Sequence, residues 1–135
     1  MIGMSSQSAT GTFEIDSWDD DIFDEGEAAK LGRTRLTKTF QGDVQGTSVV
    51  NMLGVSVPGE NDEFQGVAYV AVERVNGSVH GRKGSFVLMH TAGPDGFAVK
   101  IVPGTGGAEL AGITGQIIIK RDEDGSHTYT LEYEL

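Results

Sequence analysis

Eight segments of the chain alternate apolar and polar residues, and short turn signals separate them. No stretch between them has the length and periodicity of a long helix. Eight antiparallel strands can close into a barrel whose interior is filled or holds one small ligand, and short links favour a meander. We therefore expect an all-β, closed antiparallel meander barrel of about eight strands over 10–135, with 1–9 as a flexible tail. A two-sheet sandwich is the alternative. The expected strands are 10–16, 30–41, 44–57, 63–75, 78–91, 97–102, 116–121 and 127–135.

Two segments interrupt the alternation. After Trp18 comes an acidic run over 19–27, which is too highly charged for a typical strand, so we expect a surface loop there. Asn76–Gly77 is the strongest short hairpin signal in the chain, because both residues tolerate the positive φ angles of a two-residue turn. We therefore expect the fourth strand to end at Val75.

Composition and charge exclude several classes of function. The 135 residues include no cysteine, which removes disulfides, thiolate nucleophiles and cysteine-based metal sites. The net charge of −10 disfavours binding to nucleic acids and anionic membranes. The N-terminal residues lack the pattern of a signal peptide, so we expect a cytoplasmic protein.

Cofactor and metal signatures are also missing from the sequence. The glycine-rich loop 103–107 lacks the lysine of a phosphate-binding loop. The acidic run lacks the spacing of a calcium-binding loop, and the three histidines lack zinc-ligand spacing. We therefore expect no cofactor and no metal.

The sequence also resembles a known family along nearly its whole length. The shared segments are Ser17–Trp18–Asp19–Asp20, 37–43 (TKTFQGD), Val72–Glu73–Arg74, 81–90 (GRKGSFVLMH) and 102–112 (VPGTGGAELAG). They resemble an uncharacterised bacterial family known only as a domain of unknown function. The resemblance implies an eight-stranded barrel of the allene oxide cyclase type, similar in shape to lipocalins. The chain departs from the family pattern at Ala92, where glycine is usual, and at Gly107–Ala108, which replaces a Thr–Gly pair. A shared barrel implies a fold and no activity.

Three ionisable residues lie within apolar strand segments. Glu73 is expected either to be an exposed charge near a rim or to point inward, where it would need a partner. His90 is either a hydrogen-bonded core residue or a functional group with a near-neutral pKa. Lys38 either extends to the rim of the barrel or pairs inside with Glu73 or Glu14.

The alternating aromatic positions suggest a function as well as a fold. We expect the interior to hold a small apolar ligand. The expected ligand-binding residues are Lys38, Phe40, Tyr69, Glu73, Phe86 and His90. One alternative is a small isomerase or cyclase that uses Glu73 or His90 as an acid or base. The other is a filled barrel that serves as a structural or interaction module.

Residues 67–72 are apolar at positions that would face both sides of a strand. One face would line the barrel and the other would need cover. We therefore expect a homo-oligomer, with a dimer favoured.

Overall fold

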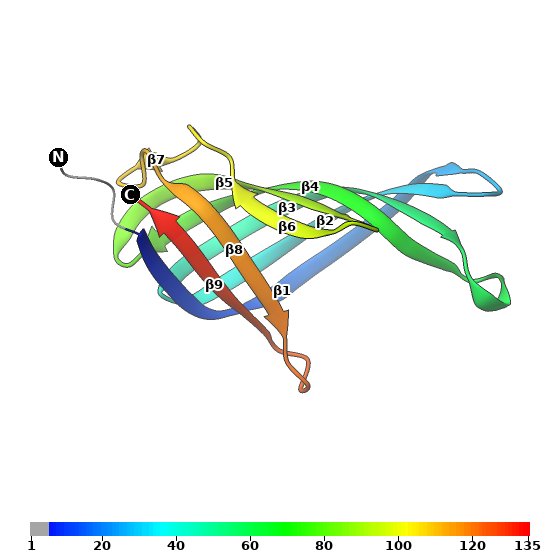
Figure 1. Cartoon of the computed structure of the whole chain (residues 1–135), viewed down its shortest axis with the longest axis horizontal. Helices are drawn as coiled ribbons and strands as arrows, with labels where there is room; N and C mark the ends of the chain where they lie inside the picture. The colour runs from blue at the N-terminus through cyan, green and yellow to red at the C-terminus, as the bar shows by residue number, and fades with distance from the viewer. Residues whose placement is uncertain (1–5) are drawn as a thin grey trace.

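The computed structural model describes residues 6–135, which form one antiparallel sheet closed into a barrel (Figure 1). Each barrel strand pairs with its neighbours in the chain, β9 pairs with β1, and β7 is a two-residue strand beside β5. The prediction of a closed eight-stranded meander barrel is confirmed. The elements are β1 (Ser6–Glu25), β2 (Lys30–Gly42), β3 (Val44–Pro58), the 3₁₀ turn η1 (Glu60–Asp62), β4 (Phe64–Val79), β5 (Arg82–Gly93), β6 (Gly96–Ile101), β7 (Gly107–Ala108), β8 (Thr114–Arg121) and β9 (His127–Glu134).

The barrel begins earlier in the chain than expected. Ser6–Ala9 pairs with β9, and Ala9 is fully buried, so these residues belong to the barrel and not to a tail. The rest of the predicted tail, residues 1–5, lies outside the described residues. Within residues 6–135, no helix is long and apolar enough to cross a membrane.

Strand β1 begins and β9 ends on the left of Figure 1, and a packed core fills this half of the barrel. Aromatic rings from different strands contact one another there, as Phe40 does with Phe13 and with Tyr129. The Tyr129 hydroxyl also donates to the carbonyl oxygen of Gln41 and accepts from the backbone N–H of Val44. Side chains therefore fill the interior of this half of the barrel.

The other half of the barrel is open on one side. The β1–β9 ladder ends where Phe13 pairs with His127, so β1 pairs with β2 alone from Glu14 onward. Strands β6 and β8 share a single register pair, Lys100 with Gln116. The β1–β2 and β3–β4 hairpins therefore project beyond the closed half as a curved, single-layered sheet (Figure 1).

The prediction of an acidic surface loop is wrong, because β1 continues to Glu25. The register places Asp19 opposite Arg35 and Asp21 opposite Arg33. Opposite charges that face each other across a sheet are favourable, so the neighbouring strand compensates the acidic run. The charges of the acidic run alone do not reveal these arginines, because they lie in the next strand.

The prediction of a turn at Asn76–Gly77 is also wrong, because β4 continues to Val79. Gly77 pairs with Gly46 on β3 at such close approach that a β-carbon on Gly77 would overlap the carbonyl oxygen of Gln45. The turn lies at His80–Gly81, whose φ angles of 47° and 81° suit a two-residue hairpin. Gly77 thus serves the packing of two strands and not a turn.

We predict that Gly77→Ala destabilises the barrel by about 2 kcal/mol, because the added methyl group forces β3 and β4 apart. Gly66→Ala, in the same strand, is the matched control. A β-carbon on Gly66 meets no atom within 4 Å, so this variant should be neutral or about 0.5 kcal/mol more stable. Urea unfolding of both variants measures the difference. Equal stability of the two variants would contradict the close approach.

Candidate functional site

Four polar side chains meet inside the barrel, one from each of four consecutive strands. Glu73 on β4 accepts a hydrogen bond from Ser48 Oγ of β3 at its Oε2 atom, 2.5 Å away. At its Oε1 atom lie His90 Nε2 of β5, at 2.7 Å, and Lys38 Nζ of β2, at 3.3 Å. We call these four residues the Glu73 cluster. All four are buried, Glu73 with only 1% of its surface exposed.

The cluster keeps Glu73 ionised in spite of its burial. Burial alone raises the pKa of a carboxyl group, because the charged form loses its hydration. The hydrogen bond with His90, the positive charge of Lys38 and the hydrogen bond from Ser48 outweigh this effect and hold the pKa of Glu73 below its ordinary value. Lys38 also lies over the Phe13 ring, 4.6 Å from its centroid. Glu73 is therefore a fixed negative charge with its partners in place.

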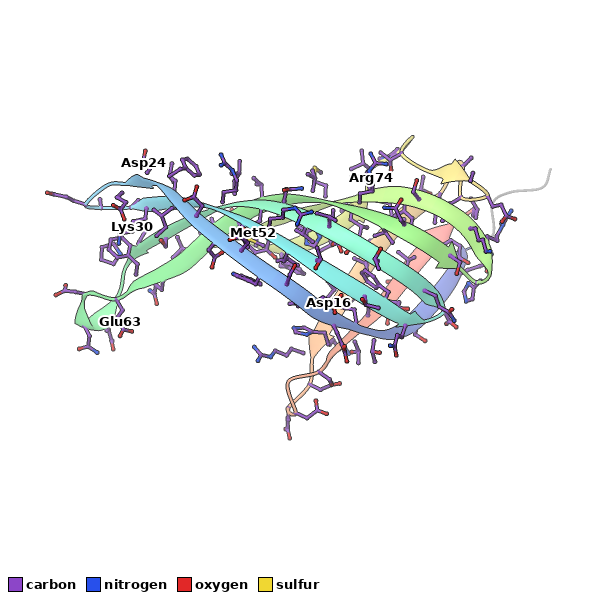
Figure 2. All side chains as sticks on the ribbon, turned by 180° about the vertical axis from the view of Figure 1, so that it is seen from behind. Asp16, Asp24, Lys30, Met52, Glu63 and Arg74 are labelled. Atoms are coloured by element: carbon purple, nitrogen blue, oxygen red, sulfur yellow. The ribbon has the colours of Figure 1, made fainter. Side chains whose placement is uncertain are left out.

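The open half of the barrel contains a pocket of about 740 Å³, which we call the cavity. One register row across the sheet supplies much of its surface: Ile22, Gly32, Gly54, Tyr69, Ala92 and Phe97 are successive cross-strand partners from β1 to β6. Lys30 and Met52, both labelled in Figure 2, also line it. The cavity is thus built by the projecting strands and not by the filled half.

Glycines leave part of the cavity surface bare. A β-carbon on Gly54 would have only ordinary contacts, the nearest at 3.7 Å, and one on Gly32 would have a single contact at 3.5 Å. Neither glycine has a positive φ. Neighbouring atoms and backbone conformation therefore permit side chains at both positions. The missing side chains leave the backbone of β2 and β3 accessible from the cavity.

Two hydrogen bonds fix the aromatic wall on β1. The indole N–H of Trp18 donates to Asp20 Oδ2 at 2.7 Å, and the Thr34 hydroxyl donates to Asp20 Oδ1 at 2.6 Å. Asp20 therefore anchors the indole to β2. Trp18 still has 56% of its surface exposed, which leaves the ring free to contact another molecule.

A small apolar group adjoins both the cavity and the Glu73 cluster, because Val50 pairs with Glu73 and Ala71 pairs with Met52 and His90. Leu36, Val50 and Ala71 form a small buried group, against which the cavity residues Met52 and Tyr69 pack. Tyr69 links the two regions electrostatically: burial and the charge of Glu73 both raise the pKa of its hydroxyl above 10.0. At neutral pH, Tyr69 thus presents a protonated hydroxyl, which can donate a hydrogen bond.

The six residues predicted to bind a ligand fall into three environments. Tyr69 lines the cavity. Lys38, Glu73 and His90 form the buried cluster, and pairing of Lys38 with Glu73 is the predicted alternative that the structure shows. Phe40 and Phe86 belong to the packed core of the filled half, because the strands close around them there.

The sequence analysis missed most of the residues that line the cavity. Ile22 lies in the acidic run and Trp18 directly precedes it, and the residue spacing from Trp18 through Asp20 to Ile22 is that of one strand face. A register shift between Ile15 and Ser17 moves the inward positions from odd to even numbers, so the alternation of the first half does not predict the second. Among the residues that the structure describes, no three His, Asp or Glu side chains are placed to hold a metal ion.

Comparisons with known proteins agree with this architecture. A family model described as "Protein of unknown function (DUF3224)" matches residues 9–133. The chain is 31% identical to a protein of unknown function from that family in Shewanella oneidensis MR-1, whose crystal structure superposes with a TM-score of 0.80 over 97% of each chain. A search of curated proteins finds no significant match.

We predict that Glu73→Gln lowers the free energy of unfolding by roughly 3 kcal/mol at pH 7, because it leaves Lys38 buried without its counter-charge. The folded-state pKa of Glu73 lies below its ordinary value of 4.5. The stability that ionised Glu73 contributes is therefore present above pH 4.5 and lost as the pH falls through the folded-state pKa. The difference in the free energy of unfolding between wild type and Glu73→Gln should therefore become smaller at acidic pH.

Urea unfolding between pH 3 and pH 7 measures this dependence. Glu14→Gln is the control, because Glu14 is an exposed carboxylate on β1, and its effect should stay below about 0.5 kcal/mol. If the difference in the free energy of unfolding between wild type and Glu73→Gln stays constant across this pH range, the ionised form of Glu73 contributes no stability.

Proposed function

The chain belongs to the DUF3224 family, and from the cavity of its open half we propose that it binds a small, mainly apolar molecule. The volume of about 740 Å³ is that of a pocket for a small ligand. Aromatic and aliphatic side chains form most of its walls: Trp18, Ile22, Met52, Val55, Val67, Tyr69 and Phe97. The single observation that carries the proposal is this apolar cavity, in which glycines expose the backbone of the sheet.

The shape of the cavity favours a ligand with a flat face. Gly32 and Gly54 are cross-strand partners and expose backbone between Ile22 on one side and Tyr69 on the other. A planar ring system can approach this backbone closely, which a chain of branched groups cannot. The ring of Tyr69 lies 6.5 Å from that of Phe97, so aromatic side chains flank the same space.

A few polar groups would orient the ligand. No hydrogen bond within the described part of the chain engages the Tyr69 hydroxyl, so it is available to donate to a ligand acceptor. Lys30 also lines the cavity, with its ammonium group 4.1 Å from the centroid of the Phe64 ring. These groups suit a ligand that is apolar over most of its surface and has an acceptor at one edge.

The geometry supports binding better than acid–base catalysis. Glu73 and His90 do not line the cavity, and both side chains are buried, with 1% and 4% of their surfaces exposed. A general acid or base must come within hydrogen-bonding distance of its substrate. The buried cluster therefore serves to hold the barrel wall in place.

Trp18 is the only tryptophan of the chain and lines the cavity, so its fluorescence reports binding there. We predict that Nile red, a flat and neutral dye, binds the purified protein and changes the Trp18 emission. A β-carbon at Gly54 has only ordinary contacts, so the side chain introduced by Gly54→Val should occupy the bare surface, and the affinity should fall about tenfold or more.

Thr47→Val is the control, because it introduces the same side chain at an exposed position of the same strand. It should bind the dye as the wild type does. Circular dichroism checks that both variants are folded. Dye binding that is absent from the wild type, or equal in all three proteins, would refute binding in the cavity.

A further inference from the structure

The outer wall of the barrel has an apolar patch on β3, β4 and β5. Leu53, Val70, Val72 and Met89 are each about half exposed, at 49%, 54%, 52% and 48%. They are neighbours in the sheet, because Leu53 pairs with Val70 and Val72 pairs with Met89. Contiguous exposed side chains of this kind mark interaction sites more often than isolated ones do. We call these four residues the outer patch.

Part of the outer patch lies behind the cavity. Leu53 follows Met52 and Val70 follows Tyr69, so each outer residue has a cavity residue beside it in the same strand. Successive side chains of a strand point to opposite faces, and the projecting sheet has only one layer. This part of the sheet is thus apolar on both faces, and a ligand in the cavity would leave the outer face uncovered.

The outer face of strands β2 to β6 has no acidic side chains. Of the 20 Asp and Glu residues, only Glu73 lies within β2 to β6, and its side chain is buried inside. The exposed charges of these strands are basic, as Arg74 shows on β4 in Figure 2. The other carboxylates lie on β1, on β9 or in connecting segments.

We propose that a second copy of this chain covers the outer patch, in a two-fold dimer that packs patch against patch. Two molecules with a net charge of −10 repel each other, and this repulsion is weakest where the contacting surfaces lack carboxylates. The wall of β2 to β6 meets this condition, and the patch at its centre is uncharged and complementary to itself. Asn51 and Thr91, which pair with Val72 and Val70, supply a polar and uncharged edge.

The size of the patch fits the centre of such an interface. A stable dimer buries about 800 Å² on each partner, of which the apolar core is one part and a polar rim the rest. Four half-exposed aliphatic side chains supply that core, and the surrounding strand surface supplies the rim. The acidic ends of the two molecules, such as the segment near Glu63, need not meet.

Sedimentation velocity of the full chain at 1–100 μM tests the proposal. The wild type should sediment as a dimer. Val72→Asp should raise the dissociation constant at least about a hundredfold, because the two-fold axis buries two new carboxylates in the interface. Ile118→Asp is the matched control, since Ile118 is a β-branched residue on β8 with 44% exposure, and it should remain dimeric.

Ionic strength provides a second test. Raising the salt concentration from 50 to 500 mM should strengthen the dimer, because salt screens the repulsion between two anionic chains and leaves the apolar contact intact. Met89→Lys repeats the disruption at a second position, in case Val72→Asp proves unfolded by circular dichroism. A monomeric wild type, a dimer that survives both patch variants, or loss of the dimer in Ile118→Asp would each overturn the proposal.

Discussion

The structure depends on one buried carboxylate. Glu73 can stay ionised inside the barrel only because Lys38, Ser48 and His90 contact it, and each of the four comes from a different strand. A charge without partners would cost several kcal/mol there, so β2 to β5 must keep the register that brings these groups together. The cluster thereby fixes the wall of the barrel between its filled half and its open half.

The open half follows from where the strand ladders end. Strand β1 leaves β9 after Phe13, and β6 meets β8 at one register pair only, so the projecting strands have no partner to close around them. Their inner face contains the cavity and their outer face contains part of the outer patch. A single-layered sheet with two apolar faces has two surfaces to cover, and the ligand and the second copy that we propose would each cover one.

Local sequence patterns predicted the strand content and left an inward position of Glu73 and Lys38 as one of two alternatives. The apolar neighbours of Lys38 and Glu73 indicated that both could face the interior, where they form an ion pair. The patterns failed where a distant strand decides the outcome. The acidic run after Trp18 extends because Arg33 and Arg35 lie opposite it, and Gly77 packs against Gly46 where a turn was expected.

The sequence by itself determined an all-β barrel of eight strands in meander order, because alternation and turn residues act over a few positions. Only the tertiary structure decided where the cavity lies. A register shift between Ile15 and Ser17 reverses which side chains of β1 point inward, and Val67 is left without a partner where β4 passes β3. Such shifts, like the point at which two strands separate, depend on pairing between distant segments, which no local pattern records.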